Sequence, residues 1–102
     1  MIHVIAVITT KPGKREEVLG HFKANVPNVL AVDGCHAFEA TIDAAGIGEF
    51  QTKFGDDTFV VVARWERASH LAAHITAPHM AEYAAKVKDM LAERTIHVTE
   101  AA

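Results

Sequence analysis

Two segments of this chain are apolar on both sets of alternating side chains, and this feature limits the folds open to it. They are "IHVIAVIT" at 2–9 and "TFVVVARW" at 58–65. A sheet with one solvated face alternates apolar and polar residues along each strand, so both segments are predicted to be strands covered on both faces. One predicted face carries Val4, Ala6, Ile8, Phe59, Val61, Ala63 and Trp65, and the other carries Ile5, Val7, Val60 and Val62.

The hydrophobic period changes from two to 3.6 and back along the chain. The predicted elements are strand 2–9, helix 15–30, strand 35–42, a long, mobile hairpin loop at 43–57, strand 58–65, helix 69–76, a helix from Pro78 whose apolar stripe reaches Leu91, and strand 94–100. Pro27 should kink or restart the first helix. In strand 35–42, one face is expected to carry His36, Phe38, Ala40 and Ile42.

This order of elements, βαββαβ, favours one topology. With right-handed crossovers it predicts an α+β, ferredoxin-like fold: a four-stranded antiparallel sheet with the helices on one face. Helices on one face would leave the other apolar face as an exposed patch of several hundred Å², which monomers rarely tolerate. We therefore expect a homodimer whose subunits pair through their sheet faces.

Composition limits the partners and the compartment. A chain of 102 residues fits a single domain spanning 1–102, and its net charge of −3 offers no basic face for nucleic acid. No stretch approaches the ~20 apolar residues of a membrane span, and the apolar run at 2–8 lacks the basic start and cleavage site of a signal peptide. The single cysteine, Cys35, suits a reducing cytosol, so a cytoplasmic location is expected.

The segment "RWERASHLAAHITAPHMAEY" at 64–83 holds the only Trp, the only Tyr and three of the seven His residues. Leu71, His74 and Ile75 share one helix face, so His74 is expected to point into the protein. His70 lies about 100° from Leu71 around the helix and is expected to meet water.

A metal site is the first alternative for these histidines. Catalytic zinc needs at least three protein ligands, and His70 with His74 supplies two on one helix. The zinc-protease pattern places Glu directly after the first His, but Leu71 stands there, and no Cys pair or acidic cluster supplies a third ligand. No metal site is therefore predicted.

The second alternative is an organic pocket. Phe38, Trp65, His74, His79 and Tyr83 are expected to converge on the gap between sheet and helices, and an apolar cleft with a few polar groups is the usual form of a small-molecule site. The competing interpretation is structural: His74 and His79 would form hydrogen bonds near helix ends, and Trp65 would be core. The residue pattern alone leaves both open.

Four stretches also carry a family resemblance: "AVITTKPGKREEVLGHFK", "VDGCHAFEA", "VVVARWERASHLAAHITAPHM" and the closing strand. In order and spacing they resemble the antibiotic biosynthesis monooxygenase family, which includes small bacterial quinol monooxygenases. The resemblance spans nearly the whole chain. It implies a ferredoxin-like fold assembled as a dimeric α/β barrel, with a cavity between sheet and helices. It also implies oxidation of a quinol or polycyclic phenol by O₂ without flavin, haem, metal or any other cofactor.

Roles follow from the resemblance by position. His74 and Trp65 are the catalytic candidates: His74 as the inward polar group and base, with the usual histidine pKa of about 6.5, and Trp65 as the ring against which substrate packs. The substrate-binding candidates are Phe22, Phe38, Val61, His79 and Tyr83. Some family members carry an amide where this chain has Val61, so a hydrogen bond to the substrate oxygen would have to come from elsewhere. The haem-degrading branch carries an Asn near the position of Ala6, which argues against haem.

Two functions remain at this point. One is a cofactor-independent monooxygenase acting on a quinol or polycyclic phenol. The other is a non-oxidative binding protein or isomerase of the same fold. A larger, flatter, wholly apolar cavity would favour the first, and a small cavity lined by Arg, Lys and several His residues would favour the second.

Overall fold

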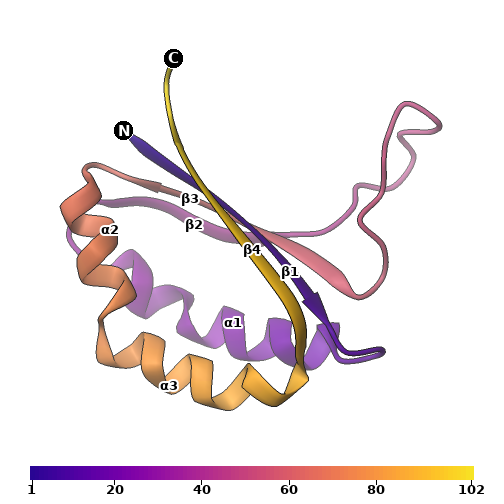
Figure 1. The fold of residues 1–102 in the computed structure, drawn as a ribbon, viewed down its shortest axis with the longest axis horizontal. Coiled ribbons are helices and arrows are strands. Elements are labelled where there is room, and N and C mark those ends of the chain that lie inside the picture. Colours follow the sequence, from indigo (N-terminus) through magenta and orange to yellow (C-terminus); the bar gives the residue numbers. More distant parts are fainter.

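A four-stranded antiparallel sheet, in the order β2-β3-β1-β4, forms the centre of the fold. The computed structural model describes residues 1–102. Its elements are β1 (Ile2–Thr10), α1 (Arg15–Leu30), β2 (Cys35–Thr41), β3 (Thr58–Trp65), α2 (Ala68–Ile75), α3 (Pro78–Val87), the 3-10 turn η1 (Lys88–Met90) and β4 (Leu91–Glu100). All three α-helices lie on one side of the sheet (Figure 1). The predicted α+β, ferredoxin-like fold is confirmed. None of the helices combines the length and apolar character of a membrane span.

The pairing of β1 with β3 explains why both segments are apolar throughout. Val4 lies beside Ala63 and Ala6 beside Val61, so the face toward the helices is continuous across the two central strands. The most completely buried large side chains on the helix side include Trp65, Phe59, Val18, Val29 and Val87. Burial of this apolar surface is the main contribution to the stability of the fold.

The opposite face of the sheet is apolar only at its centre. Ile5 is 41% exposed and Val62 is 36% exposed, and the same face carries Glu39 beside Val62 and His97 beside Ile5 on the two edge strands. The outer face is therefore an apolar strip bordered by polar strands. It suits a contact with a second subunit, and the dimer itself stays a prediction.

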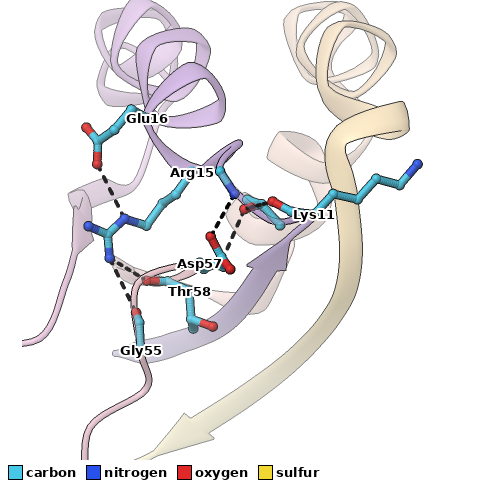
Figure 2. A network of polar contacts seen from close by, with 8 residues as sticks. Lys11, Arg15, Glu16, Gly55, Asp57 and Thr58 are labelled. Carbon is cyan, nitrogen blue, oxygen red and sulfur yellow. Dashed lines mark hydrogen bonds and ion pairs between the residues drawn. The ribbon is translucent and has the colours of Figure 1, made fainter.

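A polar network fixes the turn between β1 and α1 (Figure 2). The Gly13 N–H donates to the Asp57 carboxylate at 3.0 Å, and Gly13 has φ of 77°, a conformation that favours glycine. The Arg15 guanidinium donates to the carbonyls of Gly55 and Thr58, each at 3.4 Å. These bonds join the Lys-Pro-Gly turn to the start of β3.

Several boundaries differ from the sequence prediction. Helix α1 runs to Leu30 without restarting, because Pro27 lies in the last turn and removes only its own N–H donor, while Ala31 still donates to the Pro27 carbonyl at 3.2 Å. Strand β4 begins at Leu91, three residues earlier than predicted, where Leu91 pairs with Thr10. The helical stripe therefore ends at α3 and η1.

The predicted face of β2 is wrong at its beginning. The register shifts between Cys35 and Ala37, so His36 is the extra residue of a β-bulge. Phe38 pairs with Ala63 and Ala40 with Val61, on the helix side. His36 is instead exposed, 4.0 Å from the Glu66 carboxylate, and Ile42 lies beyond the end of the strand and is 53% exposed.

The connection from β2 to β3 contains no helix or strand and projects from the sheet (Figure 1). Its base is held by Asp43, whose carboxylate accepts from the N–H groups of Phe54 and Gly55, both at 2.9 Å. These two bonds lower the pKa of Asp43. Phe50 at the far end is 95% exposed. The predicted long hairpin loop is confirmed, and its mobility stays a prediction.

Candidate active site

A cavity of about 640 Å³ lies between the inner face of the sheet and the helices, and 19 of its 24 lining residues are hydrophobic. The cavity extends beneath β4, whose inward residues Ile96 and Val98 are 51% and 54% exposed. This edge of the sheet therefore forms the mouth. A volume of this size accommodates a drug-sized organic molecule.

His74 is the only histidine in the cavity wall, and it lies where the sequence predicted it. Its side chain is only 6% exposed. The imidazole stacks on Trp65 with 4.9 Å between ring centroids and 28° between planes, and it meets Phe38 edge to face at 5.6 Å. The predicted inward orientation of His74 beside Trp65 is confirmed.

The rest of the predicted α2 face is less regular. Leu71 is half-buried as expected, but Ile75 is 63% exposed and lines the cavity near solvent. His70 was expected in water and is half-buried, with its ring against Gly34 so closely that a Cβ on Gly34 would overlap it. Gly34 has φ of 80°, so a glycine is favoured there for both conformation and space.

The electrostatics of His74 follow from its surroundings. Burial, and secondarily the neighbouring His79, lower the pKa of His74 from its usual 6.5 to about 4. The imidazole is therefore neutral at pH 7, with one donor and one acceptor nitrogen. Its Nδ1 is buried without a hydrogen-bond partner. This pKa lies below the usual histidine value that the sequence led us to expect, and the role of His74 as a base stays a prediction.

Trp65 lines the cavity, as its expected role requires, but it is 0% exposed and His74 covers one face of its ring. Substrate therefore cannot stack on this face unless His74 moves. The contact of Trp65 with substrate stays a prediction. In the present arrangement Trp65 supports and orients His74.

The aromatic wall consists of the other predicted rings. Phe38 stacks on Phe22 at 4.9 Å with 18° between planes, and Tyr83 meets Phe22 edge to face at 6.1 Å. Burial raises the pKa of Tyr83 to about 12, so its hydroxyl stays protonated and can donate. Val61 also lines the cavity, 7% exposed. These four substrate-binding candidates are brought together.

His79 is the exception. Its ring centroid lies 6.1 Å from that of His74, but it lines a separate polar cleft of about 90 Å³ between α1 and α3. Its Nε2 is buried without a partner. His79 therefore affects the cavity through its proximity to His74, and the expected position in the cavity wall is wrong.

One polar residue of the cavity was missed by the sequence reasoning. Asn25 is 9% exposed and lines both the cavity and the small cleft. Its side-chain oxygen accepts from Asn28 Nδ2 at 3.1 Å, and its Nδ2 meets only the sulfur of Met80 at 3.7 Å, a weak acceptor. The signal was present, because Asn25 follows Phe22 by three residues on the buried face of α1.

Two charged residues were also missed. Lys88 and Arg94 line the cavity at the end of α3 and the start of β4. Arg94 alternates in step with Ile96 and Val98, which could have revealed its inward position.

No group of three or more His, Cys, Asp or Glu side chains is placed to share a metal ion. His70 and His74 point to different surroundings, one toward Gly34 and the other toward Trp65. The two ligands that the sequence offered on one helix therefore do not converge with a third.

We compared the chain with protein families, with the sequences of known proteins and with solved structures. The family model described as "Antibiotic biosynthesis monooxygenase" matches residues 1–86. The chain is 38% identical over 102 residues to the protein named "Probable quinol monooxygenase YgiN" of Escherichia coli K12, covering 98% of this chain and 97% of that protein.

Two solved structures share the fold. PA3566 from Pseudomonas aeruginosa is 20% identical, with a TM-score of 0.81 and coverage of 99% and 93% of the two chains. Rv0793 from Mycobacterium tuberculosis is 22% identical, with a TM-score of 0.80 and coverage of 99% and 94%. The matched family and the full-length relative show that this chain belongs to the antibiotic biosynthesis monooxygenase family.

Proposed function

We propose that this protein is a cofactor-independent monooxygenase that oxidises a hydroquinone or polycyclic phenol with O₂. The observation that carries the proposal is a neutral, inward-facing His74 in a large cavity with aromatic and aliphatic walls. The 38% identity to a protein named as a probable quinol monooxygenase supports the same substrate class. The non-oxidative alternative was linked to a small cavity lined by Arg, Lys and several His residues. This cavity contains Lys88 and Arg94, but it is large and has a single His, which supports the oxidative function.

The stoichiometry of the reaction explains why no cofactor is needed. A hydroquinone with a free ring C–H reacts with one O₂ to give a hydroxyquinone and one water. One oxygen atom enters the C–H bond, and the other leaves as water with two hydrogens from the substrate. Forming the C–OH and converting hydroquinone to quinone each release two electrons, so the substrate supplies all four that O₂ takes.

The low pKa of His74 determines when the proton moves. A hydroquinone hydroxyl resembles a tyrosine phenol, whose pKa is about 10, so its transfer to an imidazole of pKa about 4 costs about 8 kcal/mol by itself. A phenol becomes a strong acid once it has lost an electron. We therefore place proton transfer to His74 together with electron transfer to O₂, and His74 first acts as a hydrogen-bond acceptor for the hydroxyl.

Neighbouring groups complete the proposed site. Asn25 can turn its weakly bound Nδ2 toward a substrate or peroxide oxygen, replacing the amide that is absent at Val61. Tyr83 can donate from its protonated hydroxyl. The apolar walls hold the ring and exclude water from reduced oxygen intermediates. Trp65 keeps the imidazole in place and is a positioning residue in this proposal.

We also propose that the protein acts as a homodimer in the cytoplasm. The apolar strip around Ile5 and Val62 on the outer face of the sheet supports pairing of two sheet faces. The single cysteine supports a reducing compartment.

An oxygen electrode tests the proposed activity. Metal-free, EDTA-treated protein is mixed with one- to three-ring hydroquinones, and O₂ uptake is compared with uncatalysed autoxidation. The proposal expects a faster rate with at least one substrate, one O₂ consumed per substrate, and no return of O₂ when catalase is added. Uptake that requires added metal or flavin, or that equals autoxidation throughout the panel, would refute it.

A further inference from the structure

The cavity contains charge of one sign only. Among its 24 lining residues, Lys88 and Arg94 are the only ones with ionised side chains at neutral pH, and no Asp or Glu is present. Neither residue takes part in an ion pair; the pairs in the structure involve Lys14, Arg15 and His36. The cavity, whose other lining residues are uncharged, therefore has two unpaired cations, both exposed at its edge.

Both cations lie at the same end of the cavity. Arg94 pairs with Ile8 on β1, and Lys88 opens the η1 turn that leads from α3 into β4. Arg94 shares the inward face of β4 with Ile96 and Val98, so it takes a place that this face otherwise gives to apolar residues.

His74 lies at the opposite end. It stacks on Trp65, which pairs with Ile2, and contacts Phe38, which lies in the row of Ala63 and Val4. Val4 and Ile8 are four residues apart on β1, or about 13 Å at a strand rise of about 3.3 Å per residue. The space between imidazole and guanidinium therefore suits a ring system of two or three fused rings.

Resting on the proposed function, we propose that Arg94 and Lys88 form an anion subsite for the substrate. It selects fused-ring hydroquinones or phenols that carry a carboxylate at the end remote from the reacting hydroxyl. An Arg guanidinium can bind a carboxylate through two parallel hydrogen bonds, which fixes orientation as well as position. The carboxylate held at the mouth then places the opposite hydroxyl beside His74.

Arg94 and Lys88 also have a structural explanation. Solvated cations on an edge strand commonly prevent pairing with other strands, and a Lys near a helix C-terminus interacts favourably with the helix dipole. If these were their only roles, the affinity for a ligand would not depend on the charge of the ligand.

A redox-inert probe separates the two interpretations. 6-Hydroxy-2-naphthoate carries hydroxyl and carboxylate at opposite ends of two fused rings, and its methyl ester and 2-naphthol lack the charge.

Binding is measured by ligand fluorescence and calorimetry with the full chain. The subsite predicts that the wild type binds the carboxylate about tenfold more tightly than the ester at low salt, with a smaller preference at about 0.5 M salt. Arg94→Met should remove about five- to tenfold of carboxylate affinity and leave 2-naphthol within about twofold. Lys88→Met should lose less carboxylate affinity than Arg94→Met. The double variant should bind the carboxylate and the ester equally. Arg67→Met is the matched control, because Arg67 is exposed and lies outside the cavity.

Equal binding of carboxylate and ester by the wild type would overturn the subsite, as would a preference that survives in the double variant. Failure of the carboxylate to bind would do the same. The protein could prefer the carboxylate through Arg94 and yet oxidise no hydroquinone. That result would support the anion subsite and refute the proposed reaction.

Discussion

The imidazole of His74 stacks on the indole of Trp65, with 4.9 Å between centroids and 28° between planes. This contact joins the end of β3 to the last turn of α2 and fixes which surface of His74 remains for a ligand. Burial, and secondarily the neighbouring His79, lower the pKa of this imidazole to about 4, so the only histidine of the cavity is neutral at pH 7.

Removing this imidazole should affect turnover more than folding. His74→Ala should lower the turnover of an identified hydroquinone by about 10²–10⁴-fold, the usual range for loss of a proton-transfer group. The free energy of unfolding should fall by about 1–2 kcal/mol, since one buried polar side chain is lost. Steady-state kinetics and urea unfolding measure the two quantities.

The control for this variant is His36→Ala, because His36 is exposed on the β2 bulge and lies outside the cavity. His70 is unsuitable since its ring packs on Gly34. Full activity in His74→Ala together with a large loss of stability would show that His74 is structural.

The pH dependence of stability should report the buried state of His74. Its folded pKa of about 4 lies below its usual 6.5, so the unfolded chain binds the proton first as the pH falls. The contribution of neutral His74 to the free energy of unfolding is fully present above pH about 6.5 and is lost as the pH falls toward 4. The total loss is about 3 kcal/mol. Urea unfolding at several pH values should show this decline in the wild type and a smaller one in His74→Gln. Equal declines in both proteins would contradict a buried, neutral His74.

The close approach of His70 to Gly34 should be visible in a pair of glycine variants. Gly34 and Gly13 have φ of 80° and 77°, but a Cβ on Gly13 would have open space and one on Gly34 would overlap the His70 ring. Gly34→Ala should therefore cost about 1–3 kcal/mol more than Gly13→Ala. Adding His70→Ala to Gly34→Ala should recover most of the difference, as measured by thermal unfolding. Equal costs for the two glycine variants would show that this contact is not tight.

Much of the fold could be predicted because it depends on long periodic patterns. The two-sided apolar pattern of β1 and β3 indicated the central strands, and the i, i+3 spacing placed His74 inward. The bulge at His36 could not be foreseen, since it depends on how β2 pairs with β3. His79 was misplaced because the Pro78 turn sets the direction of α3, and helix periodicity cannot give the angle between two helices.

The polar residues Asn25 and Arg94 show a second reason why sequence-based prediction missed part of the cavity. Asn25 and Arg94 each lie in the pattern of an apolar face, where sequence reasoning favours the apolar neighbours. Their neighbours do not show that the surrounding elements leave a cavity there. That information comes only from the three-dimensional arrangement of the helices and the sheet, whose residues line the cavity together.

The oligomeric state should depend on the outer face of the sheet. Light scattering at micromolar concentration should give about twice 11.1 kDa for the wild type. Val62→Glu should shift the protein toward the monomer, because two carboxylates would be buried at a symmetric contact. Lys23→Glu, an exposed change on α1, should leave the dimer intact. A monomeric wild type would remove the argument for pairing through the sheet.

Oxygen labelling tests the central claim most directly. A fused-ring hydroquinone with a free ring C–H is oxidised under ¹⁸O₂ by metal-free protein, and the rapidly quenched product is examined by mass spectrometry. The account predicts a hydroxyquinone containing one ¹⁸O atom, with labelled water as the second product and much less of both from His74→Ala. An unlabelled quinone accompanied by one labelled H₂O₂ per substrate would contradict monooxygenation and identify a simple oxidase.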